Sequence, residues 1–169
     1  GNRTLIVGSA GGNGDFSGSF VVNGGSTPSL TKTGGGTQIL SGGNSTLNGL
    51  LIQEGTLTLS NNATVTVNNN VAVGDTNTGN LNIFDNAALT MNGELLIGDS
   101  NGVAGNVTQT GGTVNVGNRI RNAHWPNNIS TYSLSGGALI VTNAINVGWD
   151  GIGIFNQTGG ATTAGQVIV

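Results

Sequence analysis

Short runs of alternating apolar and polar residues recur along most of this chain at a nearly constant interval. In each run two apolar residues stand two positions apart, which is typical of a β-strand that turns one side toward a core. No segment places apolar residues at helical spacing. The first class of runs carries the pairs Val65 and Val67, Leu89 and Met91, Val114 and Val116, Leu139 and Val141, and Thr162 and Ala164.

A pair of small residues precedes each of these runs, and the pairs define the period. They are Asn62-Ala63, Asn86-Ala87, Gly111-Gly112, Gly136-Gly137 and Gly159-Gly160. The strand that enters each unit is marked by Leu57, Leu81, Val107, Tyr132 and Phe155. The sequence therefore repeats with a period of about 24 residues, a length typical of stacked repeat proteins.

A second short run follows the first in each unit. Its apolar residues are Val71 and Val73, Leu95 and Ile97, Ile120, Ile145 and Val147, and Val167 and Val169. Glycines end three of these runs, at Gly74, Gly98 and Gly148, and we expect Asn122 to take that place in the third unit. Glycine and asparagine fit corners at which the backbone needs a positive φ.

A unit of this size cannot bury its apolar side alone, but stacked units place like residues about 4.8 Å apart and form a continuous core. The pattern predicts an all-β fold, a single-stranded parallel β-helix (β-solenoid) of roughly seven coils in one domain, residues 1–169. Residues 60–169 form regular coils of about 24 residues, and residues 1–59 form irregular ones. A β-sandwich also has frequent Gly/Asn turns, but it does not predict five columns in register.

Residues 30–59, LTKTGGGTQILSGGNSTLNGLLIQEGTLTL, carry a motif of their own. A Leu-Thr-Lys-Thr-Gly opening precedes a Leu-Ser-Gly centre and a Gly-Thr-Leu close. On these residues the segment resembles the autotransporter-associated β-strand repeat, also called the passenger-associated transport repeat. The matches are Leu30, Thr31, Lys32, Thr33, Gly34, Gly36, Thr37, Leu40, Ser41, Gly42, Asn44, Gly55, Thr56 and Leu57; Gln38, Ile39 and a missing Tyr-Thr-Gly centre depart from it. The resemblance implies a right-handed parallel β-helix, export to the bacterial cell surface and a structural or adhesive role without catalytic residues.

The composition excludes several classes of function. The chain of 169 residues has 32 Gly, 7% charged residues and a net charge of -3. Its basic residues, Arg3, Lys32, Arg119 and Arg121, are too few for nucleic-acid binding or for an anionic membrane surface. No apolar run reaches membrane-spanning length, and no secretory leader opens the chain. If the protein is exported, we expect the sequence to be its mature form or an excised part. With one His and no Cys, a His/Cys metal site is impossible, and no cofactor is expected.

The segment RIRNAHWPNNIST, residues 119–131, breaks the rhythm and gathers rare residue types. It contains Arg119, Arg121, His124 and Trp125, and Trp149 follows one period after Trp125. If the two indoles project from the same corner of adjacent coils, a surface glycan could stack on them and bond to the arginines. The competing interpretation is a longer turn whose Trp covers the core edge.

Carboxylates offer a second place for chemistry. Asp75 and Asp99 follow the corner glycines of successive coils, and Asp150 lies one position off their column. Stacking would hold Asp75 and Asp99 roughly 5 Å apart, the spacing of a retaining glycosidase, which makes a polysaccharide-cleaving β-helix enzyme the third hypothesis. Repetition produces that spacing by itself, so we expect no catalytic residue, a weak calcium site at most, and side chains that accept a backbone N–H.

The chain starts and stops on the same class of strand. Thr4, Leu5, Ile6 and Val7 match the second run, and so do Gln166, Val167, Ile168 and Val169. Uncapped solenoid ends recruit further strands. The sequence therefore predicts an extracellular structural protein, a stalk, fibre or adhesin passenger. We expect it either to associate end to end into filaments or to continue into neighbouring repeats of a longer chain.

Overall fold

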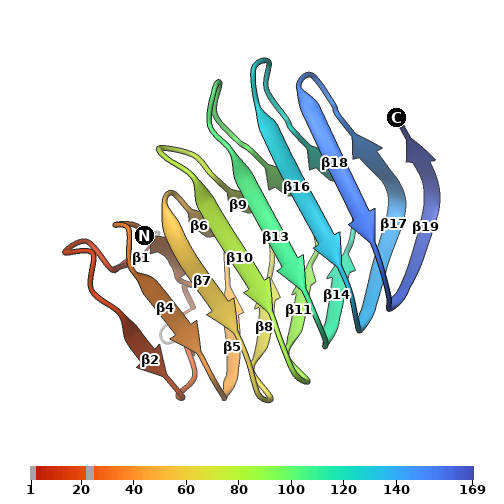
Figure 1. The fold of residues 1–169 in the computed structure, drawn as a ribbon. Coiled ribbons are helices and arrows are strands. Elements are labelled where there is room, and N and C mark those ends of the chain that lie inside the picture. Colours follow the sequence, from red (N-terminus) through yellow and green to blue (C-terminus); the bar gives the residue numbers. More distant parts are fainter. Residues whose placement is uncertain (1–2, 22–24) are drawn as a thin grey trace.

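All the regular structure in the part of the chain that the computed structural model describes, residues 3–21 and 25–169, is β-strand. Consecutive turns of the chain stack, and each strand pairs in parallel with strands one turn away (Figure 1). The seven strands of one sheet count about seven turns. The predicted parallel β-solenoid is confirmed, and a sandwich of antiparallel strands is excluded.

The turns build three faces. Face 1, at the front of Figure 1, contains β2 (Gly14–Phe16), β4 (Thr37–Leu40), β7 (Gly55–Leu59), β10 (Gly79–Ile83), β13 (Gly105–Gln109), β16 (Ile129–Leu134) and β18 (Ile152–Gln157). Face 2 contains β5 (Asn44–Leu47), β8 (Thr64–Val67), β11 (Ala88–Met91), β14 (Thr113–Val116) and the first parts of β17 (Ala138–Val147) and β19 (Ala161–Ile168). Face 3 contains β1 (Thr4–Val7), β3 (Ser29–Lys32), β6 (Leu50–Ile52), β9 (Val71–Val73), β12 (Leu95–Ile97), β15 (Ile120–Asn122) and the second parts of β17 and β19.

The strand register confirms the predicted columns of apolar residues. Val65 pairs with Leu89, Leu89 with Val114, and Val114 with Leu139. All four side chains are at most 1% exposed. The entering column, Leu57, Leu81, Val107, Tyr132 and Phe155, is in register as well. One apolar core therefore runs along the axis between the three faces.

The turns that carry the 30–59 motif are shorter than the others. Leu30 pairs with Leu50 and Leu50 with Val71, so each of these two turns falls short of the average period. Later in the chain Leu95 pairs with Ile120 and Ile120 with Ile145, so each of those turns slightly exceeds it. The period is thus an average over turns whose corner loops differ in length.

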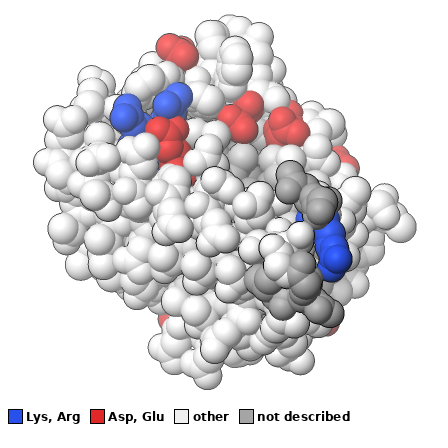
Figure 2. Space-filling view, turned by 180° about the vertical axis from the view of Figure 1, so that it is seen from behind, with Lys and Arg blue, Asp and Glu red and all other residues white. Residues whose placement is uncertain are grey.

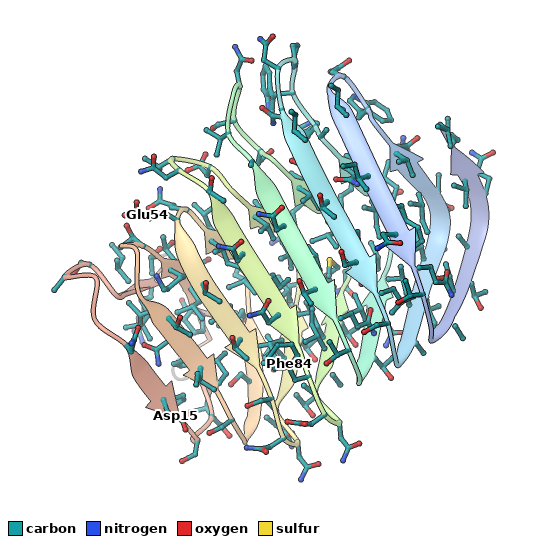
Figure 3. All side chains as sticks on the ribbon, in the orientation of Figure 1. Asp15, Glu54 and Phe84 are labelled. Atoms are coloured by element: carbon teal, nitrogen blue, oxygen red, sulfur yellow. The ribbon has the colours of Figure 1, made fainter. Side chains whose placement is uncertain are left out.

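The corner between faces 2 and 1 lies where the small pairs predict it. Gly112, Gly137 and Gly160, the second members of their pairs, have positive φ. In the two preceding turns the positive φ falls one residue before the pair, on Asn61 and Asp85. The Oδ2 atom of Asp85 also accepts the backbone N–H of Asn61 at 2.9 Å. Figure 3 shows Phe84 at this corner and Glu54 at the opposite one, between faces 3 and 1.

The corner between faces 3 and 1 corrects the prediction for Asn122. Asn122 pairs with Ile97 and Val147, so it occupies the buried column and not the glycine position. Ala123 takes the place of Gly74, Gly98 and Gly148, with a φ of 56°. The alternation that starts at Ile120 turns the side chain of residue 122 inward. Because this turn has no glycine at the corner, the sequence did not show that the corner begins at Ala123.

Candidate functional site

Most charged side chains lie on face 3 and along its corner with face 1, where Figure 2 shows them gathered in the upper part of the surface. Two residues beyond the strands of face 3, successive turns place Glu54, Asp75, Asp99, His124 and Trp149 in one column. The outward side chains of faces 1 and 2 are mostly Thr, Asn, Ser and Ala. The candidate site is therefore on the face 3 side, around the irregular segment at residues 119–131.

Glu94, which precedes β12, is the centre of this site. Its Oε1 atom lies 3.3 Å from Nε of Arg119 and accepts Nη2–H of Arg121 at 3.2 Å. Its Oε2 atom lies 3.0 Å from Nε of Arg121. The two Nε atoms are at ion-pair distance but lack hydrogen-bond geometry. Because the Glu94 side chain is only 14% exposed, water screens this ion pair less than it screens a surface pair.

Trp149 covers the arginines from the next turn. The guanidinium carbon of Arg121 lies 4.5 Å from the centre of the indole, and that of Arg119 lies 5.9 Å away. A guanidinium over an indole face gains a cation–π attraction. The backbone N–H of Trp149 donates to the backbone carbonyl oxygen of Asn122 at 3.0 Å, which fixes the position of the backbone from which the indole extends. Trp149 is thus held in place by the turn beneath it.

His124 joins this ion pair to a carboxylate of the preceding turn. Its Nε2 atom lies 3.1 Å from Nη1 of Arg121, and a guanidinium only donates, so Nε2 is the acceptor. The proton of the neutral ring is therefore on Nδ1, which donates to Oδ1 of Asp99 at 2.8 Å. Burial raises the pKa of Asp99 above its usual value, although the hydrogen bond from His124 lowers it in part. Both nitrogens of His124 are engaged, so neither has a free lone pair for general-base chemistry.

The predicted pair of stacked indoles is wrong. Ile120 pairs with Ile145, so the turn between β15 and β17 is one residue longer than the interval from Trp125 to Trp149. Trp149 consequently stands above His124 and not above Trp125. The Trp125 ring packs edge-on against His124, with ring centres 5.7 Å apart, and is 46% exposed. The structure brings Arg119, Arg121, His124 and Trp149 together as predicted, and it replaces the aromatic partner of Trp149 with Arg121.

The three candidate calcium ligands do not converge. Asp75 accepts Ser100 Oγ at 3.0 Å and Gln53 Nε2 at 3.2 Å, so its partners are side chains and not the expected backbone N–H. Asp99 is engaged by His124, and Asp150 is exposed. Among the described residues no group of three or more His, Asp or Glu side chains is arranged to hold a metal ion.

The burial of two polar side chains, Lys32 and Asn122, was not predicted from the sequence. Lys32 is 0% exposed, and its Nζ donates to the carbonyl oxygens of Thr33 at 2.8 Å, Gly34 at 2.5 Å and Glu54 at 3.3 Å. Asn122 is also 0% exposed; Nδ2 donates to Ile154 O at 2.8 Å, and Oδ1 has no partner among the described atoms. The signal that could have found Lys32 is the period-two spacing from Leu30, which turns residue 32 to the same side of its strand.

Comparison of the chain with protein-family models, with curated proteins and with solved structures finds no match. The functional argument therefore rests on the geometry. Within residues 3–21 and 25–169 there is also no helix of the length and hydropathy that a membrane crossing requires.

Proposed function

We propose that this chain is a structural segment of an exported, surface-displayed bacterial protein: a stalk, fibre or adhesin-passenger solenoid that is extended by strands added at its ends. One observation carries the proposal. Val167 continues the buried column of Ile120 and Ile145, which are both 0% exposed, yet Val167 itself is 58% exposed. Among the described residues no strand covers this apolar column at the last turn.

At the first turn the described residues leave an apolar column uncovered in the same way. Leu5 continues the column of Leu30 and Leu50 and is 42% exposed, whereas those two are at most 2% exposed. Within the described residues β1 pairs with β3 alone, and β19 pairs with β17 alone. Edge strands with unpaired N–H and C=O groups are templates for further strands. The added strand belongs either to a neighbouring repeat or to a second copy stacked head to tail.

The surface and the 30–59 motif support the proposed location. The motif resembles repeats of exported passenger proteins, and the outward side chains of β7, β10 and β13 are uncharged Thr and Asn. Several of them bond to one another, as Asn106 Nδ2 does to Asn80 Oδ1 at 3.1 Å. Such ordered, paired surfaces resist local opening, which suits a mechanical role outside the cell.

Sedimentation and negative-stain electron microscopy of the pure chain at rising concentration test end-to-end addition. We expect head-to-tail rods whose length grows with concentration. Val167→Glu places a charge in the open core and abolishes the rods, whereas Thr163→Glu, on the outward side of the same strand, leaves them intact. Monomers at every concentration, or equal effects of the two substitutions, would contradict addition of a second copy.

A further inference from the structure

A hollow of about 350 Å³ lies on the outward side of face 3, beside Gly49. Its volume falls within the range of about 300–1,000 Å³ typical of ligand sites. Gly49 directly precedes β6, and Ser29 and Asn70 lie next to it in the turns on either side. Because glycine has no side chain, the outer surface has a gap at this point. Strands added at either end of the chain would lengthen face 3 without covering the gap.

The fold itself does not require a glycine at this position. The φ of Gly49 lies outside the left-handed region, and an added Cβ would lie 3.7 Å from Ser29 Oγ and 4.0 Å from the Asn70 carbonyl oxygen, which are ordinary contacts. Every other described glycine that is not exposed has a positive φ or would bring a Cβ within 3.0 Å of another atom. A glycine beside a strand that meets no backbone requirement often marks a place where a ligand approaches the backbone.

We propose that the hollow at Gly49 binds one ring of an uncharged saccharide. The outward side chains of Leu51 and Ala72 supply apolar surface that the C–H face of a sugar ring can cover. The hydroxyls of Ser29 and Thr31 also line the hollow, and neither has a side-chain hydrogen-bond partner among the described residues. Both can donate to or accept from sugar hydroxyls. The proposal does not depend on the structural role proposed above.

Asn70 adds a donor that is already positioned. Its Oδ1 atom accepts the backbone N–H of Glu94, in the next turn, at 2.9 Å. A Cβ on Gly93 would overlap this oxygen, so the glycine makes room for the Asn70 amide. The Nδ2 atom of Asn70 has no acceptor among the described residues. Because the amide is held in place before a ligand arrives, less side-chain freedom is lost on binding.

The lining favours an uncharged ring over other ligands. None of the described residues that line the hollow is charged, so a carboxylate or an ammonium group would lose water without gaining a counter-ion. A peptide cannot add here as a further strand, because β6 already pairs with β3 on one side and with β9 on the other. A lipid chain would leave the hydroxyl and amide groups of the lining without partners.

Binding is measured on the whole chain by calorimetry, with neutral glucan, mannan and galactan hexasaccharides and with a hexauronate of matched length. We expect saturable binding of at least one neutral oligosaccharide and at least about ten-fold weaker binding of the hexauronate. Gly49→Leu fills the hollow and weakens neutral binding about ten-fold or more. Ala88→Leu, which adds apolar bulk to the outward side of face 2, changes binding less than about two-fold.

Gly49→Ala separates binding from folding if the leucine variant folds poorly. Its Cβ takes part of the space and gives an intermediate loss of affinity. The thermal unfolding midpoint stays the same or rises, because alanine restricts the unfolded chain more than glycine does. A lower midpoint together with unchanged affinity would mean that Gly49 serves the fold and not a ligand.

Two further variants test the polar groups. Thr31→Val keeps the shape but removes the hydroxyl, and weakens binding about five-fold, whereas Thr66→Val on face 2 leaves it unchanged. Asn70→Asp keeps the acceptor for the Glu94 N–H and removes the donor, so it also weakens binding. Asn68→Asp adds the same charge outside the hollow and is expected to have no effect on binding.

Three results would overturn the proposal: no neutral oligosaccharide binds, Gly49→Leu and Ala88→Leu have equal effects, or the hexauronate binds as tightly as the neutral chains. Rod formation is scored separately and is expected to be unaffected by Gly49→Leu. Loss of rods in that variant would assign the hollow to a contact between copies of the chain, which also overturns saccharide binding there.

Discussion

Lys32 and Asn122 occupy the same buried column, each one turn in from an end of the column, and they differ in their hydrogen bonds. The column runs Val7, Lys32, Ile52, Val73, Ile97, Asn122 and Val147. The other members are Val or Ile. Lys32 donates to three carbonyl oxygens, while Asn122 makes one hydrogen bond and leaves an oxygen unpaired among the described atoms.

The difference shows what a corner of this fold requires. Where the chain leaves face 3, its carbonyl groups turn inward, away from the strand ladder, and need donors. In the short motif-bearing turns a single ammonium supplies them. In the longer turns amide side chains bond to the backbone of the corner. Asn128 Nδ2 donates to the carbonyl oxygen of Gly98 at 2.6 Å, and Asn128 Oδ1 accepts the backbone N–H of Val103 at 3.0 Å. The corner near Lys32 therefore depends on one residue, whereas the corner near Asn122 does not.

Gly74→Ala tests whether every corner tolerates a side chain as Ala123 does. Of the substitutions considered, it should lower the free energy of unfolding most. A Cβ at Gly74 would overlap the carbonyl oxygen of Ala104, and its φ of 81° is unfavourable for alanine. We expect the free energy of unfolding to fall by about 3 kcal/mol or more. Urea unfolding measures the loss, and Gly102→Ala, whose Cβ would meet nothing within 4 Å, controls for backbone strain alone. Equal losses would contradict the steric explanation.

Lys32→Met is expected to have the next largest effect, a loss of about 2 kcal/mol in the free energy of unfolding, because it keeps the apolar stem and removes the donor to three carbonyl oxygens.

The same lysine predicts a pH dependence of stability. Burial lowers the pKa of Lys32, and the charge of Glu54 raises it again. The unfolded chain therefore binds more protons between the lowered pKa and the ordinary value of 10.5, so this lysine makes stability rise with pH across that window. Denaturant unfolding at several alkaline pH values checks both points. A Lys32→Met variant as stable as the unmodified chain would show that the corner closes without the ammonium.

The sequence predicted the columns and the corner between faces 2 and 1, but it did not predict the corner between faces 3 and 1 at residues 119–131, for a physical reason. Alternation is a binary signal, so Val65, Leu89, Val114 and Leu139 could be placed in register without coordinates. The length of a corner loop has no such signal, and a change of one residue in that length shifts every later residue. That shift moved Trp149 from Trp125 onto His124, and the absence of a glycine displaced the expected corner from Ala123 to Asn122. The contacts of Glu94 with two arginines depend on side-chain reach between turns, which spacing does not encode.

Tyr132 tests whether the core near Asn122 tolerates charge as the core near Lys32 does. Tyr132 is 0% exposed, and its hydroxyl donates to Gln109 Oε1 at 2.7 Å. Burial raises its pKa, so above about pH 10 the unfolded chain loses a proton that the folded chain keeps. Stability should fall by about 1.4 kcal/mol per pH unit in that range. As the only tyrosine, it should show no phenolate absorbance before unfolding, and Tyr132→Phe removes the slope. A phenolate signal from the folded chain would contradict this.

Asn122→Val should have the smallest effect, and its size decides whether the two polar members of the column are equivalent. Valine restores the apolar character of Ile97 and Val147 and removes the unpaired Oδ1, but it leaves the Ile154 oxygen without its donor. These opposing contributions keep the change in unfolding free energy within about 1 kcal/mol. Asn128→Val is the matched control; it removes both a donor and an acceptor that are used, and should lose about 2 kcal/mol. A loss for Asn122→Val as large as that of Lys32→Met would mean that a corner in the longer turns also depends on one residue.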